Sequence, residues 1–188
     1  MRVKDFCNIR IGYAFRERLT NISDGNVMVV QPKNITQDGF VFEKDEPLRT
    51  NVPASKVLQA GDVLVVNRGR FAAEVFNLEG AWVVPSSILI LSVNDESVLP
   101  EYVALYFNSV KGQNMFRRRL EQTTVPFISA KNLGAMDIPV PPLERQKDLI
   151  AFEKSVTRYN LLTNKKQELL QKILNTELNI TNKEEIPS

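Results

Sequence analysis

The most restrictive feature of the sequence is a long run without proline or glycine that follows a proline-rich stop. Residues 137–146 read DIPVPPLERQ, and prolines 139, 141 and 142 disfavour the α region for each residue before them. From residue 143 to residue 178 there is neither Pro nor Gly, and helix formers dominate. This run predicts a single helix that is roughly 50 Å long at about 1.5 Å per residue.

An apolar stripe along the predicted helix indicates a helical partner. Alternating steps of three and four residues place apolar side chains at Leu149, Phe152, Val156, Tyr159, Leu170 and Ile173. Thr163 and Lys166 interrupt the stripe, at positions where polar residues can set the register of a coiled coil. Because a small domain cannot cover so long a stripe, we expect a second long helix to cover it. The alternative is a helix folded back across its own domain.

The residues before the stop predict a mixed α+β domain. Apolar runs bounded by turn residues predict strands at 26–31, 38–42, 62–67, 74–78 and 82–93, and we expect Pro85 to mark an edge or bulge. Helical spacing after Pro100 predicts a helix that breaks near Lys111-Gly112, and Ser129 is a good N-cap for a short helical turn. The predicted organisation is a domain over 1–142, a helix over 143–179 and a flexible tail over 180–188.

Composition excludes most catalytic mechanisms. The chain has no histidine and one cysteine, Cys7, which rules out a disulfide framework, Cys/His zinc sites and imidazole chemistry. Neither phosphate-cradling glycine motif is present. Glu43, Asp45 and Glu46 share a polar loop with Lys44, which is typical of a solvated face. We therefore expect a non-catalytic chain without cofactors. A magnesium-dependent nuclease is the enzyme alternative.

The hydropathy pattern indicates the cellular compartment of the protein, and the charge balance indicates what kind of nucleic-acid site it can have. The N-terminus lacks a signal-peptide pattern, and the apolar runs are too short to span a bilayer, so we expect a soluble, cytoplasmic protein without membrane contact. Lys and Arg number 24 against 22 Asp and Glu. Since the overall charge is nearly balanced, any site for nucleic acid must be a local cluster.

Three local clusters carry cations and amides without any acid among them. The candidate DNA-binding residues are Asn67, Arg68 and Arg70 at a strand end; Lys111, Gln113, Arg117, Arg118 and Arg119 on a helix; and Thr124, Lys131 and Asn132 around a helix start. Lys and Arg neutralise phosphates, and Arg, Asn and Gln can contact base edges. Each cluster also has a structural explanation, respectively a hairpin turn, a solvated helix face and a capped connection. Their coexistence favours DNA.

Four segments together resemble the specificity subunits of type I restriction-modification systems. They are LQAGDVLVVNRGR (58–70), WVVPSSILIL (82–91), TTVPFISAKNLGAMDIPVPPLERQ (123–146) and the long helix after them. The third segment is the most specific, because its strand, turn and proline stop occur in one fixed order. The resemblance covers nearly the whole chain. It implies a target recognition domain followed by a spacer helix.

The resemblance also implies partners and cofactors. A specificity subunit does no chemistry itself; it directs a DNA adenine methyltransferase, which uses S-adenosylmethionine, and a restriction/translocase subunit, which uses ATP and Mg²⁺, to a bipartite site in double-stranded DNA. None of these cofactors is expected on this chain. A full specificity subunit has two recognition domains and two helices, whereas this sequence has one of each. We expect either a homodimer, joined through an antiparallel coiled coil, or a fragment of a longer chain.

The resemblance does not transfer base contacts, so the roles rest on residue chemistry. Arg68 and Arg70, with Asn67, are candidate groove contacts, whereas Arg117, Arg118, Arg119 and Lys131 are candidate phosphate contacts. The competing hypothesis is a coiled-coil assembly protein without specific DNA recognition, whose cations only solvate its surface. Salt-dependent binding to duplex DNA separates the two hypotheses.

Overall fold

The computed structural model describes residues 1–37, 39–43, 47–120 and 127–184, and it divides into two compact units. Unit 1 is Met1–Ile150 and unit 2 is Ala151–Ser188. The domain boundary predicted at residue 142 therefore falls eight residues before the end of unit 1, because the first turns of the long helix belong to that unit. The predicted architecture, a mixed α+β domain followed by a long C-terminal helix, is confirmed.

The centre of unit 1 is an antiparallel sheet of four strands in the order β1-β9-β6-β7. The strands are β1 (Cys7–Ile11), β9 (Ile88–Val93), β6 (Val63–Val66) and β7 (Ala73–Val75). Alternate residues of β6 and β9 enter two different cores: Val63, Val65, Leu89 and Leu91 enter one, and Leu64, Val66, Ile88 and Ile90 enter the other. Burial on both faces explains the uninterrupted apolar runs VLVV and ILIL.

Two small sheets complete the strand content of the described residues. One has the order β5-β2-β8, formed by Arg49–Thr50, Val27–Val29 and Trp82–Val83, and the other pairs β3 (Ile35–Thr36) with β4 (Gly39–Phe40). Single 3₁₀ turns occupy Val3–Asp5, Pro32–Asn34 and Ala54–Lys56. The run predicted as one strand over 82–93 is interrupted at Pro85, which forms an isolated bridge to Tyr13 and belongs to neither β8 nor β9.

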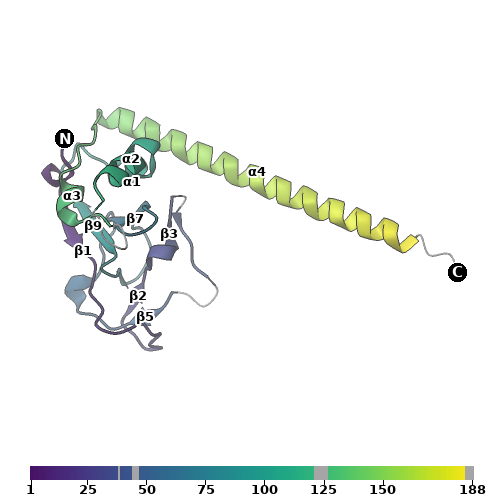
Figure 1. Ribbon diagram of the computed structural model, residues 1–188, viewed down its shortest axis with the longest axis horizontal. Coiled ribbons are helices and arrows are strands. Elements are labelled where there is room, and N and C mark those ends of the chain that lie inside the picture. Colours follow the sequence, from purple (N-terminus) through teal and green to yellow (C-terminus); the bar gives the residue numbers. More distant parts are fainter. Residues whose placement is uncertain (38, 44–46, 121–126, 185–188) are drawn as a thin grey trace. The chain divides into compact units, whose positions relative to one another are not determined.

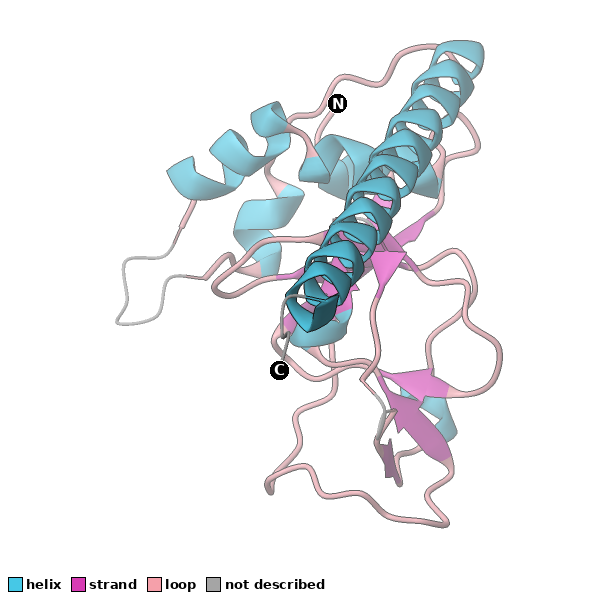
Figure 2. Ribbon diagram, turned by 90° about the vertical axis from the view of Figure 1, so that its right-hand side faces the viewer, coloured by secondary structure: helices cyan, strands magenta, loops and turns pink. Residues whose placement is uncertain are grey.

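Three short helices lie next to β1, β7 and β9, whereas β2 and β5 lie at the opposite end of unit 1 (Figure 1). The helices are α1 (Pro100–Asn108), α2 (Val110–Arg118) and α3 (Ala130–Gly134). Figure 2 shows that the end around β2 and β5 consists mostly of loops. Ser129 caps α3 as predicted, since its Oγ accepts a hydrogen bond from the Asn132 N–H at 3.2 Å.

The break in the predicted 100–122 helix falls at Ser109 and not at Lys111-Gly112. The Ser109 Oγ donates to the Tyr106 carbonyl at 2.6 Å and accepts from the Gly112 N–H, so it ends α1 and caps α2. Gly112 is needed for close packing, because a Cβ there would lie 2.2 Å from the Tyr106 oxygen. The prediction was wrong because Gly112 serves the close packing of α2 against α1 and does not break the helix.

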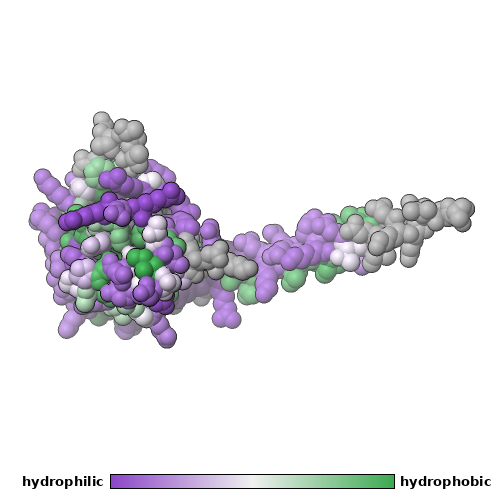
Figure 3. All heavy atoms as spheres, turned by 90° about the horizontal axis from the view of Figure 1, so that it is seen from below, coloured by the Kyte–Doolittle hydropathy of each residue, from purple (hydrophilic) through white to green (hydrophobic). Residues whose placement is uncertain are grey.

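The long helix α4 spans Leu143–Glu184 and so continues past the predicted end at residue 179. Of the predicted tail, residues 185–188 lie outside the described part. The side chains of the predicted stripe from Phe152 to Ile173 are exposed, together with Leu161, Leu162, Leu169, Leu174 and Leu178. Figure 3 shows apolar residues in green reaching the surface along α4 beside polar ones. Coiled-coil pairing stays a prediction.

Within unit 1, the start of α4 is held by the buried side chain of Gln146. Its Nε2 donates to the carbonyls of Ser97 at 2.7 Å and Pro141 at 2.8 Å, and its Oε1 accepts from the Leu99 N–H at 2.9 Å. The Tyr102 hydroxyl donates to the Pro139 carbonyl at 2.8 Å, and burial raises the pKa of this phenol. These bonds fix the proline segment and the first turn of α4 against the start of α1.

Replacing Gln146 by leucine should therefore destabilise the chain. Gln146→Leu leaves one N–H and two carbonyl groups of the backbone without their partner, and we expect a loss of about 1–3 kcal/mol in the free energy of unfolding. Urea denaturation measures this change, and Lys147→Ala, at the exposed next position, should stay within about 0.5 kcal/mol of the unchanged chain. Equal stability of the Gln146→Leu variant and the unchanged chain contradicts this role.

Candidate nucleic-acid interface

The described parts of the three basic clusters are joined in the folded chain. The turn after β6 pairs with the segment before α3, because the Asn67 carbonyl accepts from the Ile128 N–H at 2.9 Å and Arg68 forms a backbone bridge with Phe127. The Asn132 Nδ2 donates to the Arg119 carbonyl at 3.2 Å and so links α3 to the end of α2. Segments that lie far apart in the sequence therefore meet at one place.

The side chain of Phe116 packs α2 against the turn after β6. Phe116 is 1% exposed, and its ring lies 5.0 Å from that of Phe71, nearly parallel, and 5.2 Å from that of Phe107. The Gln113 Nε2 adds hydrogen bonds to the carbonyls of Phe71 at 3.3 Å and Phe107 at 2.9 Å. Gly112 and Phe116 lie on the buried side of α2. Lys111, Arg117 and Arg118 therefore remain exposed.

We use the name basic surface for the seven cations that these segments carry: Arg68, Arg70, Lys111, Arg117, Arg118, Arg119 and Lys131. All are exposed except Arg119, which is half-buried. In the part of the chain that the structure describes, none of them forms an ion pair with a carboxylate. The segments 67–72, 110–120 and 127–132 contain no Asp or Glu. Exposed cations without an ion-pair partner among the described residues attract polyanions.

Three amide side chains predicted to contact DNA make contacts within the protein or lie inside it. Asn67 is buried, and its Oδ1 has no hydrogen-bond partner among the described residues. The Gln113 Nε2 is occupied by two carbonyls, and the Asn132 Nδ2 holds Arg119. These residues position the basic surface, and direct base contacts by Asn67 would require its side chain to move. Thr124 lies outside the described residues.

Phe127 and Asn108, which support the segments of the basic surface, were not predicted from the sequence. Phe127 lies beneath the Arg68 guanidinium, whose carbon is 5.1 Å from the ring centroid. The Asn108 side chain pairs with both backbone groups of Ala73, with its Oδ1 accepting at 2.9 Å and its Nδ2 donating at 2.8 Å, and this joins α1 to β7. A phenylalanine or asparagine gives no local signal of such a contact, because its partner is distant in the sequence.

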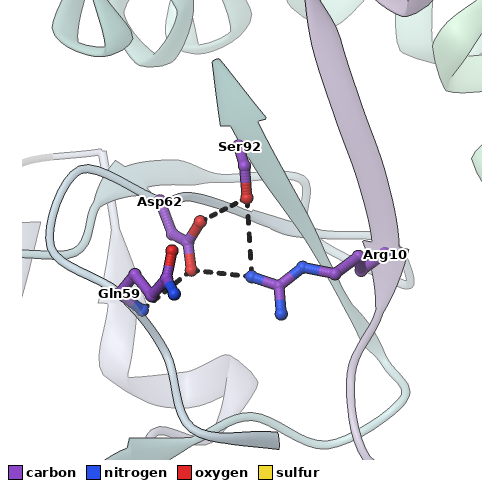
Figure 4. A network of polar contacts seen from close by, with 4 residues as sticks. All are labelled: Arg10, Gln59, Asp62 and Ser92. Carbon is purple, nitrogen blue, oxygen red and sulfur yellow. Dashed lines mark hydrogen bonds and ion pairs between the residues drawn. The ribbon is translucent and has the colours of Figure 1, made fainter. Parts of the chain in front are cut away.

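The Gly-Asp turn before β6 is also structural. The buried Asp62 accepts from Arg10 Nη2 at 3.0 Å, from the Gln59 N–H at 3.0 Å and from Ser92 Oγ at 2.6 Å (Figure 4). Arg10 lies on β1 and Ser92 on β9, so one carboxylate ties the start of β6 to two other strands of the sheet. The Gly-Asp pair was a usable sequence signal for this turn.

Two observations concern reactive and metal-binding side chains among the described residues. Burial raises the pKa of the Cys7 thiol to about 12, so the thiol stays protonated near neutral pH. Within residues 1–37, 39–43, 47–120 and 127–184, no three His, Cys, Asp or Glu side chains gather as a metal site would require. The same residues include no helix that is both long and apolar enough to cross a membrane.

A local group of exposed cations on one domain is the electrostatic footprint expected of a nucleic-acid-binding module. The family model described as "Type I restriction modification DNA specificity domain" matches residues 1–172. The chain belongs to this family, whose members are DNA-recognition components and generally non-catalytic. Among curated proteins none matches the sequence.

Solved structures of the same kind share the fold. One, described as showing complex assembly and conformational transition of the type I R-M system, is 21% identical with a TM-score of 0.74 and covers 97% of this chain. The HsdS subunit from Thermoanaerobacter tengcongensis is 20% identical with a TM-score of 0.63 over 85% of this chain, and the S subunit from M. genitalium is 10% identical with a TM-score of 0.51 over 97%. The chain spans 44%, 37% and 43% of their respective lengths.

The packing of Phe116 can be tested by truncation. Phe116→Ala removes the ring between Phe71 and Phe107, and we expect a loss of about 3–5 kcal/mol in the free energy of unfolding, measured in urea. Val110→Ala at the 79% exposed start of α2 is the control and should change stability by less than about 0.5 kcal/mol. Similar losses for both variants would show that this contact does not hold α2.

Proposed function

We propose that this chain is the sequence-specific DNA-binding subunit of a type I restriction-modification system. It directs a DNA adenine methyltransferase, and a restriction/translocase subunit where the system has one, to a bipartite DNA site in the cytoplasm. S-adenosylmethionine, ATP and Mg²⁺ bind to those partners, and this chain selects the sequence. The observation that carries the proposal is the basic surface, in which three distant acid-free segments meet.

The composition of the basic surface supports DNA as the ligand. Arg117, Arg118 and Lys131 are exposed cations near helix ends, which suits sequence-independent contacts to phosphates. Each neutralised phosphate adds about 0.9 to the slope of log affinity against log salt concentration. A handful of such contacts therefore supplies strong but salt-sensitive binding, and base contacts add the discrimination.

A homodimer accounts for the exposed apolar stripe of α4. Two copies of the stripe in an antiparallel coiled coil would bury the side chains of Phe152, Tyr159, Leu170 and Ile173. The chain corresponds to 44% of the length of one solved chain, so two copies make up about 88% of it. In the proposed dimer two recognition domains read the two halves of a site with two-fold symmetry.

Binding to DNA across a salt series tests the proposed role of the basic surface. In complex with the methyltransferase, Arg117→Ala should weaken binding to all duplexes and lower the slope of log affinity against log salt by about 1. Lys56→Ala removes an exposed cation outside the basic surface and should leave the slope unchanged. Fluorescence anisotropy with specific and scrambled duplexes measures both effects. Equal slopes for the two variants would remove Arg117 from the interface.

Light scattering tests the proposed dimer. Leu170→Lys places a charge inside the apolar stripe, and we expect the dimer to become a monomer at micromolar concentration. Leu161→Lys is the matched control, because Leu161 is also exposed but lies nine residues away, which is half a turn around the helix. A dimer that resists Leu170→Lys, or an unchanged chain that is monomeric, contradicts pairing through this stripe.

A further inference from the structure

Arg68 stands at the tip of a turn whose base is fixed from several sides. The turn is closed by the Val66 N–H, which donates to the Ala72 carbonyl at 2.9 Å. Asn67 anchors it further, because its N–H donates to the Ser87 carbonyl at 3.0 Å. Gly69 has a φ of +71°, which allows the sharp reversal and leaves Arg68 exposed. The backbone position of a residue at such a tip is fixed, and its side chain is accessible to a ligand.

The guanidinium of Arg68 is held by an aromatic ring and by no polar group among the described residues. Its carbon lies 5.1 Å from the centroid of the Phe127 ring, and the two residues also share a backbone bridge. A cation–π contact restrains the long side chain without using its N–H donors. The fork of donors is therefore oriented before any ligand arrives, which lowers the entropic cost of binding.

Two other arginines of the basic surface, Arg70 and Arg117, differ from Arg68. The Arg117 Nη1 donates to Asn114 Oδ1 at 2.9 Å, and the Arg70 Nη2 lies 3.5 Å from the Ile35 carbonyl. Contacts to phosphates need only a mobile cation, which Lys111 and Lys131 supply. A planar fork with fixed orientation suits a bidentate contact, and guanine presents the matching pair of acceptors, O6 and N7, in the major groove.

We propose that Arg68 determines sequence specificity by reading one guanine in each half-site, with Phe127 as its positioning residue. The proposal rests on the proposed DNA-binding function and adds the base that one residue recognises. It predicts that the site contains a guanine at a fixed position in each half. A bidentate contact of this kind discriminates against other bases by about tenfold or more.

Selection from a random duplex library tests the proposal. The complex of the chain with its methyltransferase should enrich duplexes with the fixed guanine, and Arg68→Ala should lose preference at that position alone. Arg68→Lys keeps the charge but lacks the fork, so it should lose the same preference while keeping salt-dependent affinity. Phe127→Leu should weaken the preference, and Arg117→Ala should keep it while binding all duplexes less tightly.

The outcomes separate this inference from the proposed function. Base preferences that are unchanged in Arg68→Ala and Arg68→Lys overturn the inference and leave the proposed function intact. A uniform loss of affinity in Arg68→Ala without any change in preference identifies a phosphate contact and also overturns it. If the complex with the unchanged chain enriches no sequence, the proposed function itself fails. A thermal unfolding midpoint equal to that of the unchanged chain shows that a variant is folded.

Discussion

The basic surface depends on the packing of Phe116 between Phe71 and Phe107. This single ring belongs to α2, and its two neighbours belong to the turn after β6 and to α1. Because the contact buries one side of α2, Lys111, Arg117 and Arg118 of that helix remain exposed. A hydrophobic contact among three uncharged residues therefore determines which side of α2 carries the positive charge.

Hydrogen bonds from side-chain amides also hold the helices and turns of unit 1 together. Gln113 joins α2 to Phe71, Asn132 joins α3 to α2, and Gln146 joins the first turn of α4 to the start of α1. Each amide satisfies backbone groups that end a helix or leave a strand, where the regular ladder provides no partner. Around the basic surface, side-chain amides therefore set the geometry, whereas the exposed guanidinium of Arg68 contacts the Phe127 ring.

The sequence predicted the features that depend on local rules. The proline stop, the start of α4 after Pro142, the Ser129 cap and the interruption at Pro85 all follow from residues within one or two turns of each other. The helix break was predicted at Lys111-Gly112 but lies at Ser109, because the role of Gly112 depends on its packing against α1. The links from Gln113 to Phe71 and from Phe127 to Arg68 could not be predicted, because the partners in each pair lie more than forty residues apart in the sequence.

In its proposed function, this chain selects the DNA site on which a methyltransferase acts. Methylome sequencing of cells that carry the gene together with that of the methyltransferase tests it most directly. We expect adenine methylation at one split motif whose halves are related by two-fold symmetry, and we expect this methylation to be lost when the gene for this chain is removed. The same methylated motif with and without the gene would contradict the claim.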